Sequence, residues 1–229
     1  MSDLVIYGSG GFAREVHQLV LDLVAEGAAW RVLGFLDDAR ERHGLEVHGL
    51  PVLGGWEWLR DHPGVAVAVG IGSPAARRHV VRRVLGLGPR AFPTLVHPRT
   101  WVGRGVTFGE GTVVCAGCLL TTDIAVGRHV ILNLGCTVGH DAVIADFVTL
   151  APSVNVSGGV TLQEGCDIGT GAAITPGVAV GPWTVVGAGA AVVRDLPANV
   201  TAVGVPARPI KHRPPGWQDR EGEGESEGW

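Results

Sequence analysis

A histidine followed directly by an aspartate is the strongest candidate for chemistry in this sequence. His140 and Asp141 come after Gly139, a residue without a side chain that leaves the neighbouring backbone accessible. A carboxylate next to an imidazole fixes its tautomer and raises its basicity, which suits a general base working near neutral pH. The spacing also allows a histidine at a turn that makes only a local hydrogen bond. We take His140 and Asp141 as candidate catalytic residues.

A glycine-rich turn near the N-terminus is a second candidate site. The run Gly8-Ser9-Gly10-Gly11-Phe12-Ala13 fits the pattern G-x-G-x-x-A, and a later apolar run ends in Asp37-Asp38. Glycines at such a turn let the backbone approach a pyrophosphate at a helix N-terminus, and the acid takes a ribose hydroxyl. The pattern predicts phosphate or nucleotide binding, with a purely structural strand–turn–helix as the alternative.

The elements around this turn alternate between strand and helix. Apolar runs at 4–7, 32–36 and 65–69 read as strands, and helical apolar spacing occupies 14–25 and the segment between 73 and 86. Such alternation indicates a parallel sheet. We expect residues 1–90 to form a Rossmann-like α/β domain that is about half the size of a full dinucleotide fold.

A six-residue repeat positions His140. Every sixth residue from Val96 to Val192 is apolar, and most residues four positions later are small or β-branched. This is the hexapeptide repeat of a left-handed parallel β-helix, in which three repeats make one coil of about 18 residues and Gly or Asn occupies corners that need positive φ. We expect this fold over 91–212. Its flat faces commonly pair around a threefold axis, which predicts a homotrimer.

The composition narrows the classes of function. Hydrophobic residues make up 46% of the 229 positions, and a net charge of −4 without a basic block argues against a nucleic-acid partner. No apolar stretch is long enough to span a membrane and no signal peptide is visible, so we expect a cytoplasmic protein. Three of the four cysteines, Cys118, Cys136 and Cys166, fall in the small inward series and are expected to be structural.

Motifs along nearly the whole chain resemble the NeuD/PglD family of sugar O- and N-acetyltransferases, part of the hexapeptide-repeat acyltransferase superfamily. The resemblance covers residues 4–211 in the same domain order. The segments that carry it are Tyr7–Glu15, Gly139-His140-Asp141 with Asn133 before it, Leu150-Ala151-Pro152, Ser157-Gly158-Gly159-Val160, Val186–Ala190 and Gly204–Arg208.

This resemblance implies specific roles for individual residues. It implies acetyl-CoA as co-substrate, no metal, and a nucleotide-linked 4-amino sugar whose amine attacks the thioester directly with His140 as base and Asp141 as its acidic partner. The residues matched to nucleotide-sugar positions are Gly10, Gly11, Phe12, Asp37, Asp38 and Gly72; those matched to the CoA channel are Thr149, Gly158, Thr170 and Ala188. Many family members carry a second histidine at the position of Thr149, so that contact differs here.

Other functions remain as alternatives at this stage. O-acetylation of sialic acid or another sugar hydroxyl is the nearest. A zinc hydrolyase would need three histidines, but the coils supply only His140 and His129, a corner residue expected to be solvated. An NAD-dependent oxidoreductase would leave the β-helix without a role, and a non-enzymatic scaffold would leave the His140-Asp141 pair unexplained. Residues 213–229, rich in Gly and Glu, are expected to be a disordered acidic tail.

Overall fold

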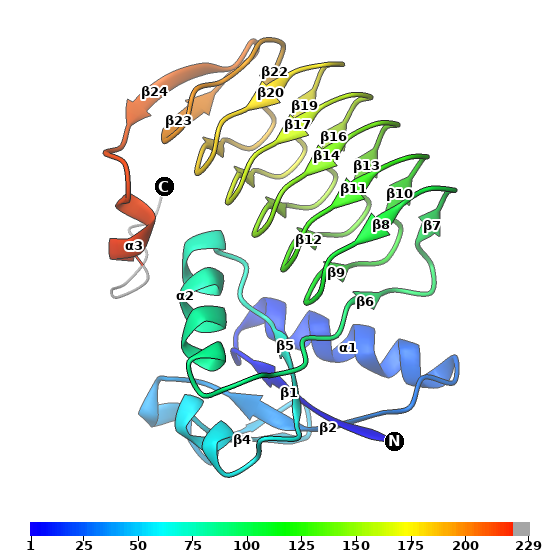
Figure 1. Cartoon of the computed structure of the whole chain (residues 1–229), viewed down its shortest axis with the longest axis vertical. Helices are drawn as coiled ribbons and strands as arrows, with labels where there is room; N and C mark the ends of the chain where they lie inside the picture. Colours follow the sequence, from blue (N-terminus) through cyan, green and yellow to red (C-terminus); the bar gives the residue numbers. More distant parts are fainter. Residues whose placement is uncertain (222–229) are drawn as a thin grey trace.

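The N-terminal domain is a five-stranded sheet with one helix on each face (Figure 1). The computed structural model describes residues 1–221. In the sheet order β3-β4-β2-β1-β5, only β3 is antiparallel to its neighbour. The elements are β1 (Ser2–Tyr7), α1 (Gly11–Ala25), β2 (Trp30–Leu36), η1 (Arg40–Arg42), β3 (Glu46–Val47), β4 (Leu50–Gly54), η2 (Trp56–Arg60), β5 (Ala66–Val69) and α2 (Pro74–Leu85).

Alternation along β1 explains why the sheet carries helices on both faces. Leu4 and Ile6 pack with α1, whereas Val5 and Tyr7 pack with the side of α2 that carries Val80, Val81 and Val84. Both sets are buried, so β1 reads as a continuous apolar run, as expected for a strand covered on two sides.

The remaining chain winds into stacked triangular coils (Figure 1). Their strands form three parallel β-sheets, one on each face of the coil. We call the face on which the N-terminal domain packs the covered face. It contains β6 (Leu95–Val96), β9 (Val113–Val114), β12 (Ile131–Leu132), β15 (Thr149–Leu150), β18 (Asp167–Ile168), β21 (Val185–Val186) and β23 (Val200–Val203), followed by antiparallel β24 (Arg208–His212). The six-stranded face contains β7 (Trp101–Val102), β10 (Leu119–Leu120), β13 (Thr137–Val138), β16 (Asn155–Val156), β19 (Ala173–Ile174) and β22 (Ala191–Val192). The outer five-stranded face contains β8 (Thr107–Phe108), β11 (Ala125–Val126), β14 (Val143–Ile144), β17 (Thr161–Leu162) and β20 (Ala179–Val180).

The predicted inward series forms the core of these coils. From Val114 to Val192 every sixth residue is buried, and in the first coil Val96, Val102 and Phe108 remain partly exposed. The three inward cysteines are fully buried free thiols. The predicted fold class, a Rossmann-like α/β domain followed by a left-handed parallel β-helix, is confirmed.

The corners of the coils require a left-handed backbone at a regular interval. Every sixth residue from Gly105 to Gly189 has a positive φ, and nine of these fifteen positions are glycine. Asp141 is one of the exceptions, with φ of 59°. Aspartate tolerates this region better than most residues, so the corner can place a carboxylate beside His140 at little cost.

The N-terminal domain packs on the covered face and on the corner that precedes it. In that corner His129 has a positive φ, yet it is buried between Phe92 and Phe147. The prediction of a solvated His129 was therefore wrong. Burial and the neighbouring guanidinium of Arg77 lower the pKa of His129 to about 4, so the ring is neutral and behaves as a third aromatic side chain.

The segment after β24 is also more ordered than predicted. Residues 213–221 contain the short helix α3 (Trp217–Glu221), in which Asp219 pairs with Arg78 and Arg82 of α2. The Arg213 guanidinium lies 4.4 Å from the Trp217 ring. Ion pairs and aromatic contacts hold this segment, which corrects the prediction of disorder for it; residues 222–229 lie outside the described residues. Within the described chain, no helix is long and apolar enough to cross a bilayer.

Candidate active site

His140 lies at the corner between β13 and β14, which we call the His140 corner. Its Nδ1 is 2.7 Å from an Asp141 carboxylate oxygen, and both side chains are about two-thirds exposed at 66% and 67%. Nδ1 donates to the carboxylate when it carries the proton, which leaves Nε2 unprotonated and free to accept one. The predicted pairing of the two side chains is therefore present in the geometry.

Gly158 lies against the imidazole, one coil further along the chain. A Cβ atom on Gly158 would come within 2.6 Å of His140 Nε2, so only glycine leaves room for the ring. The Gly159 N–H donates a 2.8 Å hydrogen bond to the His140 carbonyl. The Gly158 N–H has no hydrogen-bond acceptor among the described residues. Of the two amides at this corner, Gly158 is thus the one available to a ligand.

The four residues matched to the CoA channel do not lie together within one chain. Thr170 and Ala188 stack at the corner between the covered and six-stranded faces, where the Gly189 N–H donates to the Thr170 carbonyl. Gly158 belongs instead to the His140 corner. Only contacts between neighbouring copies, as the predicted trimer provides, would bring these two corners to one ligand.

Thr149 occupies a different environment from the one predicted. Its hydroxyl donates to the Gly72 carbonyl at 2.8 Å and accepts from Arg77 at 2.9 Å, and the side chain is buried under the N-terminal domain. The hydroxyl thus already donates one hydrogen bond and accepts another inside the protein. Thr149 therefore joins the two domains, and its contact with CoA stays a prediction.

Arg77 of α2 forms the centre of this junction. The side chain is 1% exposed, and its Nη1 donates to the carbonyls of Ile71 and Gly72, both at 2.8 Å. Nε and Nη2 donate to coil carbonyls, those of His129, Phe147 and Val148. Burial without a carboxylate in contact lowers the pKa of Arg77 to about 9. The sequence does not single this residue out, because no local signal distinguishes Arg77 from the other three arginines of α2.

The glycine-rich turn presents an open helix N-terminus. Gly10 caps α1 without a side-chain hydrogen bond, and a Cβ on Gly10 would meet nothing within 4 Å. Behind the turn, a Cβ on Gly70 would come within 2.6 Å of the Ala13 Cα, so this glycine allows the close helix–strand approach. Free N–H groups at an uncapped helix start favour an anion such as a diphosphate.

The two aspartates predicted to hold the nucleotide organise this turn. Asp37 accepts from the Ser9 N–H at 3.2 Å and from the Ser9 hydroxyl. Asp38 accepts from the Tyr7 hydroxyl at 2.7 Å and pairs with Arg83. Burial and Asp38 raise the pKa of Tyr7, which keeps the phenol protonated as a donor. The aspartates and the turn are brought together, as predicted.

Cationic side chains beside the turn were missed from the sequence. Arg42 donates to the Ser9 hydroxyl at 2.8 Å and lies 3.7 Å from Asp37. An Arg14 guanidinium nitrogen lies 3.9 Å from where a Cβ on Gly11 would be. Both arginines can neutralise a diphosphate at the start of α1. Their positions in the sequence could have indicated them, since Arg14 directly follows the glycine-rich motif and Arg42 comes shortly after Asp38.

The predicted acceptor site and His140 lie on opposite sides of the coil. The N-terminal domain packs on the covered face, and the His140 corner joins the other two faces. In a three-sided coil, that corner is the one opposite the covered face. Acceptor and base within one chain are therefore separated by the body of the β-helix.

Known proteins resemble this chain in sequence and fold. Residues 3–84 match the model of the PglD N-terminal domain. The acetyltransferase domain of PglB from Neisseria gonorrhoeae FA1090 is 31% identical with a TM-score of 0.83, covering 92% of this chain and 100% of that domain. Perosamine N-acetyltransferase from Caulobacter crescentus, solved as a histidine variant with CoA and GDP-perosamine, is 34% identical with a TM-score of 0.82, covering 92% of this chain and 98% of that one.

This chain belongs to the NeuD/PglD family of sugar acetyltransferases. UDP-N-acetylbacillosamine N-acetyltransferase from Bacillus subtilis (strain 168) is 37% identical over 118 residues, so the match spans 51% of this chain and 52% of that relative. The PglB domain has also been solved with acetyl coenzyme A. Acetyl-CoA as the co-substrate of this NeuD/PglD fold is thus confirmed, and no group of three or more potential metal ligands occurs among residues 1–221.

Proposed function

We propose that this NeuD/PglD family member transfers the acetyl group of acetyl-CoA to the amine of a nucleotide-linked 4-amino sugar in the cytoplasm. The observation that carries the proposal is the His140 corner, where a base paired to Asp141 lies against the unused Gly158 N–H. The names of the relatives support an amine over a hydroxyl acceptor, since they are N-acetyltransferases of perosamine and of UDP-N-acetylbacillosamine.

The chemistry follows from these two groups. The acceptor nitrogen attacks the thioester carbonyl and forms the C–N bond, Nε2 of His140 takes the proton that the amine loses, and collapse of the tetrahedral adduct then breaks the C–S bond. The Gly158 N–H is the donor proposed for the oxyanion that develops on the carbonyl. The imidazolium then returns its proton to the departing CoA thiolate. Asp141 holds the ring in the required tautomer and stabilises its charged form.

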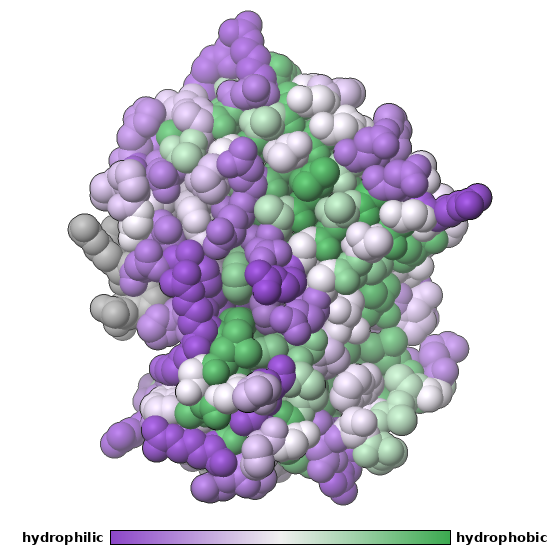
Figure 2. All heavy atoms as spheres, viewed as in Figure 1, coloured by the Kyte–Doolittle hydropathy of each residue, from purple (hydrophilic) through white to green (hydrophobic). Residues whose placement is uncertain are grey.

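A second copy of the chain is needed to complete the proposed site. Because the His140 corner is opposite the N-terminal domain, acceptor bound in one chain must meet His140 of a neighbour. The two faces that flank this corner carry exposed apolar residues, namely Trp101, Leu119 and Val143. Figure 2 shows apolar side chains gathered along the coils. These faces support a homotrimer.

Two measurements test this function. Purified protein is incubated with acetyl-CoA and UDP-, GDP- or dTDP-linked 4-amino sugars, with matched 4-hydroxy sugars and sialic acid as alternative acceptors. We expect release of CoA and an N-acetylated product with one of the amino sugars only. Sedimentation should give about three times the 23.8 kDa chain mass. Faster acetylation of a hydroxyl, or full activity of a monomer, would contradict the proposal.

A further inference from the structure

Residues 213–221, which we call the C-terminal strap, bring the chain back from the β-helix to the N-terminal domain. The strap begins at Arg213, whose N–H donates to the Asn199 carbonyl at 2.8 Å. It ends at α3, which lies beside α2 (Figure 1), and there Asp219 pairs with Arg78. The strap therefore connects the last strands of the β-helix to the second helix of the N-terminal domain.

Arg78 is the point where the strap, α2 and the coils meet. Its side chain is 9% exposed, and its guanidinium lies 4.4 Å from the centre of the Trp183 ring. Nη2 pairs with Asp219, and Nη1 lies 3.4 Å from Glu164. A buried guanidinium needs such partners, because burial without them removes its hydration at a large cost. Asp219 supplies the closer of the two carboxylates.

The coil side of this contact is an unusual corner. Trp183 has a φ of 57°, and a Cβ atom on Gly165, one coil earlier, would come within 2.3 Å of the indole ring. Bulky residues rarely adopt a left-handed backbone, so surrounding contacts must hold Trp183 in this conformation. The cation–π contact with Arg78 is one of them. The corner and the strap therefore share one guanidinium.

The other polar groups of the strap hold it less firmly. Asp219 and Arg82 are 57% and 64% exposed and lie 3.4 Å apart, and such a surface ion pair contributes little to stability. Trp217 Nε1 and Gln218 Oε1 are buried without a hydrogen-bond partner among the described residues, which makes docking of the strap less favourable. Docking therefore depends mainly on the contact between Asp219 and Arg78.

Helix α2 links this contact to the predicted nucleotide site. Arg83 follows Arg78 by five residues and so lies on roughly the opposite side of the helix, where it pairs with Asp38. The first turn of α2 follows the loop that contains Gly72, whose carbonyl accepts from Arg77. A movement of α2 on the coils would therefore shift two of the residues matched to the nucleotide sugar.

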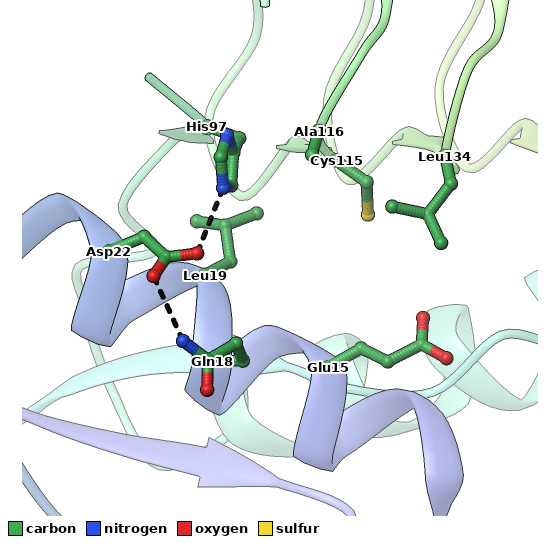
Figure 3. Close-up of a pocket in the computed structure, with 8 residues that line it drawn as sticks. All are labelled: Glu15, Gln18, Leu19, Asp22, His97, Cys115, Ala116 and Leu134. Atoms are coloured by element: carbon green, nitrogen blue, oxygen red, sulfur yellow. Dashed lines mark hydrogen bonds and ion pairs between the residues drawn. The ribbon is translucent and has the colours of Figure 1, made fainter. Parts of the chain in front are cut away.

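The boundary on the α1 side leaves room for such a movement. His97 Nε2 donates to Asp22 at 2.9 Å, and a cavity of about 150 Å³ lies beside this pair, between α1 and the coils (Figure 3). A cavity forfeits packing contacts that a filled boundary would make, so α1 restrains the domain only weakly. The contacts of α2 must therefore set how the N-terminal domain sits on the β-helix.

We propose that the strap positions the acceptor site, with Asp219 as a positioning residue that acts through Arg78 and α2. This inference rests on the proposed function. With the strap docked, α2 holds Gly72 and Asp38 in the geometry that binds the nucleotide; with the strap released, α2 moves and acceptor affinity falls. By linkage, bound nucleotide favours the docked strap to the same extent. The His140 corner lies on the opposite side of the coil and is not affected.

Asp219→Asn tests this role in the full-length protein, because it keeps the shape of the side chain and removes its charge. Coupling between sites typically changes affinity by about 5–150-fold, so we expect at least about a fivefold higher acceptor KM. The Kd of the UDP, GDP or dTDP that the wild type binds best should rise by a similar factor. The kcat and the acetyl-CoA KM should stay at the wild-type level. Asp219→Glu, which retains the charge, should recover most of the affinity.

The matched control is Arg82→Met, which removes the exposed ion pair and leaves Arg78 in place; it should behave like wild type. Hydrogen exchange of the wild type gives a second readout, since the amides of the strap should exchange more slowly once the nucleoside diphosphate is bound. Wild-type KM and Kd in Asp219→Asn would overturn the positioning role, as would an equal rise in the acetyl-CoA KM or unchanged exchange of the strap. Failure of the wild type to bind any nucleotide or nucleotide sugar would instead remove the proposed function, and the positioning role with it.

Discussion

The Arg77 guanidinium donates a 2.9 Å hydrogen bond to the Thr149 hydroxyl at the boundary between the two domains. Thr149 in turn donates to the Gly72 carbonyl, which Arg77 also contacts at 2.8 Å. The three residues form a closed set of contacts that spans α2, the loop after β5 and the covered face. The position of the Gly72 loop is therefore set by the β-helix, and not by its own sheet alone.

Replacing Arg77 should weaken both stability and acceptor binding. Arg77→Met leaves the carbonyls of His129 and Phe147 without a donor, and an unsatisfied buried group costs about 1–3 kcal/mol. We expect a lower Tm and a several-fold higher KM for the acceptor, with kcat and the acetyl-CoA KM close to wild type. Arg77→Lys should rescue part of the loss, and Arg82→Met on the exposed side of α2 is the control. A wild-type Tm and acceptor KM for Arg77→Met would show that the junction is not needed.

His140→Ala should remove the proposed base. Loss of a general base typically lowers kcat by about 10²–10⁴-fold, and acetyl-CoA should still bind because its site is otherwise intact. Asp141→Asn should cost less, since it disturbs only the orientation and charge of the ring. Steady-state kinetics and calorimetry measure the two effects. His212→Ala, on the exposed strand β24, should behave like wild type; near-normal kcat for His140→Ala would rule out this mechanism.

Gly158→Ala should lower kcat without unfolding the coil. The added Cβ would approach His140 Nε2 to 2.6 Å and displace the ring, whereas the backbone at Gly158 does not have a positive φ and accepts alanine. We expect at least about a tenfold loss of kcat, equivalent to about 1.4 kcal/mol, at an unchanged Tm. Gly64→Ala, where the new methyl meets nothing within 4 Å, is the matched control. The prediction fails if both variants retain full kcat.

Asp167→Asn should stabilise the protein at neutral pH and not at acid pH. Asp167 pairs in register with Thr149 on the covered face; burial raises its pKa to about 6, and Arg77 only partly opposes this shift. A raised carboxyl pKa means that the folded state holds the proton more tightly than the unfolded state. Stability is therefore lost as pH rises from about 4 to about 6, because only the unfolded chain ionises freely.

The substitution should thus raise Tm above pH 6, by an amount equivalent to about 1–3 kcal/mol. Near pH 4 the variant and the wild type should have the same Tm. Thermal denaturation at several pH values measures the difference, with Asp61→Asn at an exposed position as the control. A stabilisation that is independent of pH would point to a cause other than ionisation.

The features that repeat locally were predictable from the sequence. A period of six residues places His140 and Gly158 at the same corner, because eighteen residues make one coil, and it buries Cys136 and Cys166. The helix start at Gly11 followed from glycine spacing. These relationships depend on residues within one coil or one turn, so the pattern contains the information needed to place them.

Contacts between the domains were not predictable in the same way. Thr149 and His129 sit at ordinary repeat positions, and only the docked N-terminal domain distinguishes them from residues facing water or ligand. Arg77 and Asp219 acquire partners far away along the chain. A single sequence carries no periodic signal for such pairs, since their geometry depends on how two separately folded surfaces meet.

The joint made by Arg77 has a consequence for how such proteins diversify. Three of its coil partners, His129, Phe147 and Val148, contribute main-chain carbonyls, and every residue type carries one. Apart from Thr149, which contributes its hydroxyl, the coil side of the joint can therefore change its sequence without losing its acceptors. A different nucleotide-recognition domain could be grafted onto the same coils provided that its second helix brings an arginine to this point. The coils and the domain that recognises the nucleotide could thus evolve separately and be exchanged between proteins.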